Sequence, residues 1–318
     1  MLNKIKNLIL IFYRPISKIL FYIKRIFTFH LHLGSPDYYP DNESIKGGVF
    51  NIFKNDEERV EFWTKLAKKH NTLRHFYSEN PESSFLNNFD KSKFKECDEI
   101  TLKSLTEFYQ NGVVEIPNFF NQEEHNLINE FFEKKINTKL SNLDKYSWKS
   151  YSSDLNKTIH NKIKIFEKII FNKKIGIQKY TLSAWKKQQN NTSQAKEDIN
   201  FHSDRFIPAV KFIYFPTKVE VDPFEYCLGS HKINNQFLEN YKIIHKHLSA
   251  ETSSENLNYS DYNKRKYKVE ANTLIIAATH GLHRRSQTKE KEISGVRRFI
   301  TIGYYNMFSR YDLLKNYF

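Results

Sequence analysis

The sequence is poor in the residues that mark disulfide-rich, disordered and repeat proteins. Its 318 residues include only two cysteines, nine glycines and eight prolines. Cys97 and Cys227 lie far apart and form no C-x-x-C pair, which argues against a disulfide framework and a cysteine zinc site and is typical of a reducing cytoplasm. With 39% hydrophobic and 15% aromatic residues and no internal repeat, we expect a globular chain with a packed core.

Acidic residues are outnumbered, with 36 Asp and Glu against 50 Lys and Arg and a formal charge of +14. This balance favours anionic partners. The lysines are scattered among acidic residues, however, and no nucleic-acid-binding motif is present. The expected partner is therefore a small molecule, anionic or linked to a carrier, and not a nucleic acid.

Residues 1–33 contain no acidic residue at all, while basic residues alternate with apolar ones. Their apolar runs are shorter than the roughly 20 residues that span a bilayer, and a small-residue signal cleavage site is missing. Two interpretations stay open: an interfacial helix that makes peripheral membrane contact, or a helix packed on the main domain. We assign residues 1–97 to this basic segment and a helical extension, and residues 98–318 to the main domain.

The main domain mixes helical and strand patterns. A helix is predicted over 98–111, ended by Asn111 and Gly112, and a strand over 113–120. Asn121 and Glu124 form the pattern of a capping box at the start of a helix over 121–136. A further helix is predicted over 159–171, and strands over 175–185, 272–279 and 299–305.

The stretch from Asn200 to Lys232 carries the chemistry. His202 and Asp204 are two residues apart, so in an extended strand both side chains lie on one face. One imidazole and one carboxylate, completed by a distant second histidine, make the 2-His-1-carboxylate arrangement that leaves open positions on iron(II).

The motifs that accompany this H-x-D pair make it a more specific signal of a metal site. It precedes Pro208 and Lys211, then Pro-Phe-Glu-Tyr (223–226) and Gly-Ser-His-Lys (229–232), and later Thr-His-Gly-Leu-His-Arg-Arg (279–285) and Gly-Val-Arg-Arg-Phe (295–299). Over roughly residues 100–310 this order resembles the phytanoyl-CoA dioxygenase family of iron(II)/2-oxoglutarate oxygenases. The resemblance implies a mainly β fold with packed helices (α+β), built on a double-stranded β-helix, a cupin-like jelly-roll core.

The resemblance also implies a ligand set. His202, Asp204 and His283 would bind iron, with His280 as the competitor of His283. Arg297 would bind the far carboxylate of 2-oxoglutarate, because a buried carboxylate needs a charged partner and guanidinium offers a planar, two-point match. Arg298, on the opposite face of the strand, is the alternative.

Further residues are expected around this site. Lys211 and Phe215 are predicted beside the co-substrate, and Gln178, Tyr180 and Tyr226 beside the substrate. By contrast, Arg284 and Arg285 are predicted in a charged loop, and residues 233–268 form an insert. His231, just before that insert, is predicted at the surface, with His245 and His247.

The expected function is hydroxylation of an unactivated C–H, with release of succinate and carbon dioxide and with desaturation as an open alternative. It requires iron(II), 2-oxoglutarate and dioxygen, with ascorbate as reductant. Related halogenases have a small residue where this chain has Asp204, so the resemblance implies no halogenation. Two other classes stay open: a non-catalytic cupin-like binding protein at the membrane surface, and a metal hydrolase or isomerase on the same barrel.

Overall fold

The computed structural model describes residues 61, 85–87, 89–90, 92, 95–140, 145–149, 153–171, 181–187, 200–203, 209–237, 239–240, 257–286 and 295–306. Several predictions lie outside these residues. They concern the segment 1–33, most of the extension that ends at residue 97, His245 and His247, and three predicted site residues: Gln178, Tyr180 and Asp204.

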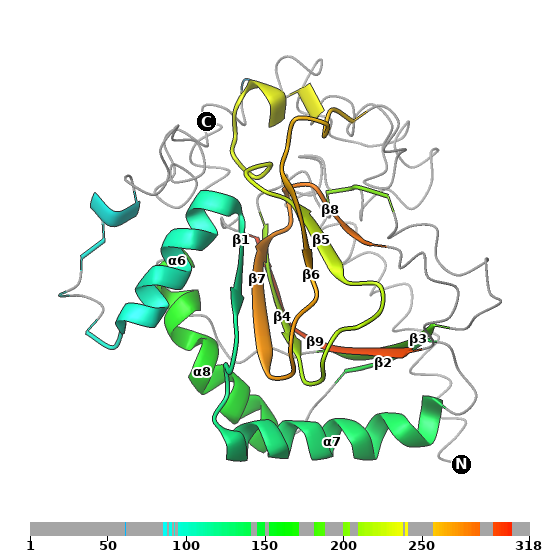
Figure 1. Cartoon of the computed structure of the whole chain (residues 1–318). Coiled ribbons are helices and arrows are strands. Elements are labelled where there is room, and N and C mark those ends of the chain that lie inside the picture. Colours follow the sequence, from blue (N-terminus) through cyan, green and yellow to red (C-terminus); the bar gives the residue numbers. More distant parts are fainter. Residues whose placement is uncertain are drawn as a thin grey trace, which may run out of the picture.

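Three long helices of the described residues lie outside the sheets (Figure 1), and one of them begins at a predicted cap. Helix α6 (Glu99–Asn111) begins after Asp98, whose carboxylate accepts the Thr101 amide at 2.7 Å, and ends at Gly112 with φ 82°. Helix α7 (Gln122–Leu140) follows Asn121, which exchanges bonds of 2.8 and 3.0 Å with Glu124. Helix α8 (Ser153–Phe171) starts six residues before its predicted beginning. The predicted capping box at Asn121 and the predicted helix end at Gly112 are therefore both confirmed.

The described strands form two antiparallel sheets. The larger has the order β1 (Val113–Ile116), β7 (Thr273–Ala278), β4 (Ala209–Phe215), β9 (Gly295–Asn306), β3 (Thr181–Lys187) and β2 (Lys145–Lys149). The smaller has the order β6 (Lys264–Tyr267), β5 (Phe224–Cys227) and β8 (His283–Arg285). Two antiparallel sheets with helices packed outside confirm the predicted α+β fold with a double-stranded β-helix core.

Alternation along the strands of the larger sheet decides which side chains reach the site. On one face, Phe212 and Tyr214 of β4 and Ile300 of β9 join a buried cluster with the helices. On the other face, Ile213 and Phe215 join a second cluster, which includes Phe224 and Tyr226 of the smaller sheet. The odd-numbered residues from Lys211 to Phe215 on β4 and from Arg297 to Thr301 on β9 thus point between the two sheets.

Three predictions about loops and strand limits are wrong. Strand β1 ends at Ile116, four residues early, because Asn118 takes a positive φ and Asn272 then bonds the backbone of Phe120. The predicted charged loop at Arg284 and Arg285 is part of β8. The insert 233–268 contains β6.

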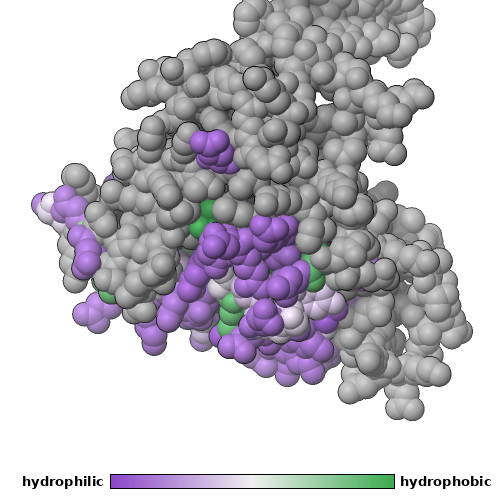
Figure 2. Space-filling view, turned by 90° about the horizontal axis from the view of Figure 1, so that it is seen from above, coloured by the Kyte–Doolittle hydropathy of each residue, from purple (hydrophilic) through white to green (hydrophobic). Residues whose placement is uncertain are grey.

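The described surface offers little apolar area. Large apolar side chains are exposed there at Leu86, Ile100 and Leu127. Figure 2 shows mainly hydrophilic residues on the described part of the face seen from above. Among the described helices, none is both long and apolar enough to cross a membrane.

Candidate functional site

Two of the predicted metal ligands lie side by side. His202 and His283 form an antiparallel bridge in which each backbone N–H donates to the other's carbonyl, at 2.9 and 3.0 Å. Their ring centroids are 4.6 Å apart, and both side chains are buried. The fold thus brings together two imidazoles that are 81 positions apart in the sequence.

The same local contact orients both rings. His202 Nδ1 lies 2.8 Å from the carbonyl of Asn200, and His283 Nδ1 lies 2.9 Å from the carbonyl of Gly281. A carbonyl oxygen only accepts, so each Nδ1 carries the hydrogen and the lone pair of the ring is on Nε2. This is the tautomer and the second contact that a metal-binding histidine uses.

A neutral imidazole pair fits iron(II), and also zinc, copper and nickel. Asp204, the predicted third ligand, follows His202 by two residues and lies outside the described part of the chain. Within that part, no three His, Cys, Asp or Glu side chains gather as metal ligands. The described half of the site therefore fits the metal, and the carboxylate stays a prediction.

His280 lies behind the site. It is buried, with Nε2 3.1 Å from the carbonyl of His231 and Nδ1 3.3 Å from both the N and the O of Ala209. Burial lowers the pKa of His280 to about 4, so the ring is neutral at pH 7. Backbone contacts on both nitrogens fix this ring in the core, which leaves His283 as the histidine next to His202.

His231 corrects a prediction. It was expected at the surface, but it is fully buried, with Nε2 3.0 Å from the carbonyl of Tyr109 at the end of α6. Burial, and secondarily the neighbouring His280, lowers its pKa well below the usual value. His231 therefore belongs to the packed base of the site.

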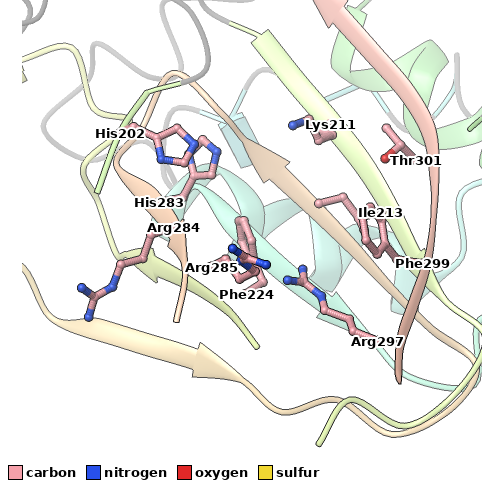
Figure 3. A pocket seen from close by; sticks show the side chains of 10 residues that line it. All are labelled: His202, Lys211, Ile213, Phe224, His283, Arg284, Arg285, Arg297, Phe299 and Thr301. Carbon is pink, nitrogen blue, oxygen red and sulfur yellow. The ribbon is translucent and has the colours of Figure 1, made fainter. Parts of the chain in front are cut away.

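A cavity of about 120 Å³ opens between the sheets beside the two histidines. It has basic side chains on its walls and, among its described lining residues, no acidic one, which suits an anionic ligand. Figure 3 shows its lining: His202, Lys211, Ile213, Phe224, His283, Arg284, Arg285, Arg297, Phe299 and Thr301.

Of the two candidate arginines, only Arg297 lines the cavity. Its Nη1 donates to the carbonyl of Asp222 at 2.9 Å, and its guanidinium lies 5.1 Å from the ring of Phe299 and 5.7 Å from that of Phe215. Arg298 points to the helix side of the sheet and pairs with Glu133 of α7. Alternation along β9 thus separates the two side chains.

Other predicted residues fall into two groups. Lys211 lines the cavity, whereas Phe215 and Tyr226 do not. Phe215 is fully buried and contacts the guanidinium of Arg297. Tyr226 is also fully buried, donates to the carbonyl of Ala278 at 2.7 Å, and stacks at 6.4 Å from the ring of His283. Both aromatic rings therefore support site residues from behind.

The sequence analysis does not predict Arg284 and Arg285 at the site, because two adjacent cations are typical of a charged loop. The alternation of side chains along an extended strand is the signal that separates the two residues. If residues 283–285 are extended, Arg285 shares the face of His283 and Arg284 takes the other. The register of β8 with β5 has this form, with His283 opposite Tyr226 and Arg285 opposite Phe224.

Arg284 holds the strand that carries His283. Its Nε donates to the buried carboxylate of Glu225 at 2.7 Å, and its guanidinium lies 4.2 Å from the ring of Phe201. Phe201 and Arg284 flank the bridge between His202 and His283, one on each strand. This contact therefore stabilises the register that brings the two imidazoles together.

We predict that Arg284→Gln weakens metal binding about tenfold, because outer partners that orient ligands typically contribute about 10–100-fold. Anaerobic titration with iron(II) measures this effect. Arg265→Gln is the matched control, since Arg265 lies on the exposed edge strand β6 and pairs with Glu115 of β1. Equal metal affinity in the two variants would contradict the positioning role.

Comparisons with protein-family models and with curated proteins give no match. The structure is similar to three solved structures among others. HygX from Streptomyces hygroscopicus, with nickel and 2-oxoglutarate bound, is 15% identical, with a TM-score of 0.45 over 65% of this chain and 87% of that one. SnoN, a non-haem α-ketoglutarate-dependent epimerase from nogalamycin biosynthesis, is 11% identical, with a TM-score of 0.43 over 68% and 84%.

EctD from S. alaskensis, with bound iron, is 9% identical, with a TM-score of 0.42 over 64% of this chain and 76% of that one. These likenesses concern the fold alone.

Proposed function

We propose that the chain is an iron(II)- and 2-oxoglutarate-dependent dioxygenase. It hydroxylates an unactivated C–H of a small-molecule, acyl or sugar-derived substrate and releases succinate and carbon dioxide. One observation carries the proposal: a cavity between two sheets has two paired imidazoles, each with Nδ1 on a backbone carbonyl, at one sheet and a buried arginine on the other.

In this proposal His202, His283 and Asp204 hold the iron, and ascorbate keeps it ferrous. The bound metal supplies the activation of dioxygen together with 2-oxoglutarate. Each Nδ1 keeps its hydrogen and donates it to a backbone carbonyl, so Nε2 is the atom that would bind the metal. The contact with Asn200 and Gly281 thereby sets the direction of both lone pairs before any ligand arrives.

Arg297 binds the far carboxylate of the co-substrate. Its side chain is 8% exposed, so the ion pair forms away from bulk water, where it is stronger than at the surface. The bond to Asp222 and the rings of Phe215 and Phe299 fix the guanidinium in advance. A pre-oriented anchor positions the keto-acid end and loses little freedom on binding.

The remaining walls exclude water and select the substrate. Ile213, Phe224 and Phe299 give the cavity an apolar side, which shields reactive species from solvent. Lys211 adds a positive charge and favours an anionic or carrier-linked substrate. Gln178 and Tyr180 remain predicted substrate contacts, and residues 1–33 remain a predicted membrane contact.

The test is succinate formation from 2-oxoglutarate by the full chain with iron(II), ascorbate and dioxygen, alone and with candidate substrates. We expect Arg297→Gln to lower kcat/KM for 2-oxoglutarate about tenfold to hundredfold, the effect of losing charge-assisted hydrogen bonds. Arg298→Gln removes the same charge from the same strand outside the cavity, and we expect it to match the wild type within about twofold.

Two outcomes would replace the proposal. Iron binding without any succinate formation would favour the non-catalytic binding protein. A metal-dependent activity that ignores 2-oxoglutarate and survives Arg297→Gln would favour the hydrolase or isomerase.

A further inference from the structure

Arg285 is a second arginine in the same cavity. It lies two residues after His283 on β8, so the two side chains share one face of the extended strand. Figure 3 shows the guanidinium of Arg285 beside Phe224, close in this view to that of Arg297, whereas Arg284 points away. Arg284 is held by Glu225 and Phe201 and does not compete for this position.

Contacts with residues 222–226 show in which order His283, Arg285 and Arg297 follow one another along the cavity. His283 lies opposite Tyr226, and Arg285 lies opposite Phe224. Ser286 donates its N–H to the carbonyl of Pro223, and Arg297 donates to the carbonyl of Asp222. Arg285 therefore lies about 6–7 Å along the strand from His283, toward the end where Arg297 is fixed.

Lys211 lies at a different place. The ring beneath Arg297 on β4 is that of Phe215, four residues after Lys211. Four residues of strand span about 13 Å, so the backbone of Lys211 is far from that end. Arg285 and Arg297 are thus the two cations that approach one end of the cavity, one from each sheet.

We propose that Arg285 and Arg297 together bind the far carboxylate of 2-oxoglutarate. This inference rests on the proposed function and assigns a second anchor to its co-substrate. A carboxylate has about four lone-pair sites, enough for two guanidinium groups. An anion between two guanidinium groups also lowers their mutual repulsion.

The proposal has a consequence for selectivity. A keto acid that lacks the far carboxylate cannot accept charge-assisted hydrogen bonds from either guanidinium, so it should bind less tightly. The comparison ligand is 2-oxovalerate, in which a methyl group replaces that carboxylate. The penalty for removing Arg285 should therefore depend on which of the two ligands is bound.

The experiment is a cycle of two proteins and two ligands, measured by calorimetric titration of the manganese(II)-loaded full chain. We expect Arg285→Gln to weaken 2-oxoglutarate binding about tenfold to hundredfold and to change 2-oxovalerate binding less than about twofold. Arg285→Lys, which keeps the charge but not the planar fork, should fall between the wild type and Arg285→Gln.

Arg298→Gln is the matched control, because it lowers the charge by one outside the cavity, and it should leave both affinities unchanged. Equal effects of Arg285→Gln on the two ligands, or no effect on either, would overturn the inference. Arg297→Gln separates the two proposals: if it too fails to distinguish the ligands, the proposed function fails. Circular dichroism checks folding, and Arg285→Lys carries the test should Arg285→Gln not fold.

Discussion

Replacing His283 with alanine is expected to abolish iron binding and succinate formation, whereas replacing His280 with asparagine leaves both measurable. His283 has its Nδ1 on the carbonyl of Gly281 and its ring beside His202. His280 has both nitrogens against backbone groups of Ala209 and His231. Loss of a direct ligand should weaken iron binding by more than about a hundredfold, since even outer partners contribute about 10–100-fold.

The measurement is anaerobic titration with iron(II), followed by the succinate assay. His202→Ala should behave as His283→Ala does, because the two rings form one pair. His280→Asn is expected to lower stability, since it disturbs a buried ring, without changing the donor atoms of the site. Iron binding that survives His283→Ala and disappears in His280→Asn would reverse the ligand assignment.

Replacing Gly112 with alanine is expected to lower the free energy of unfolding by about 3 kcal/mol or more. Gly112 has φ +82°, a region that costs other residues about 1–2 kcal/mol. An added Cβ would also lie 2.4 Å from His231 Nδ1 and 2.6 Å from the Tyr226 hydroxyl, and both rings are fully buried. Neither ring has room to move without disturbing the core.

Gly229→Ala separates strain from crowding. Gly229 has φ +80°, but the nearest atom to an added Cβ is Lys232 Cε at 3.9 Å. Its cost should be only the backbone term, about 1–2 kcal/mol. Denaturant unfolding of the two variants measures the difference, and equal losses would show that His231 and Tyr226 yield easily. Because Tyr226 stacks on His283, Gly112→Ala should also weaken iron binding.

Features encoded within a few residues could be predicted from the sequence. The cap at Gly112 and the exchange between Asn121 and Glu124 each involve partners no more than four positions apart. Their side-chain chemistry is therefore visible in the sequence itself. Strand β6 was not predicted, because its sequence KRKY is mostly basic and shows no apolar alternation, and it is held by pairing with β5.

Features that depend on distant partners could not be predicted in the same way. His231 is buried by Tyr109 and Gly112, more than a hundred positions earlier, and nothing near it in the sequence indicates this. The motif resemblance helped where periodicity did not. It directed attention to His202, His283, Lys211 and Arg297, which the structure brings to one cavity, while their roles form part of the proposal. Phe215 and Tyr226 are predicted at the site, but both are fully buried behind the residues that line the cavity.

The two imidazoles belong with the smaller sheet, through the bridge to β8, whereas Arg297 belongs to the larger one. Under the proposed function, a keto acid bound to the metal at one end and to Arg297 at the other would connect the two sheets. Its binding would depend on the distance between the two sheets, and binding would in turn fix that distance. We therefore expect metal and keto acid together to raise the melting temperature by more than the sum of their separate effects. Each ligand stabilises the spacing of the sheets that the other needs for binding.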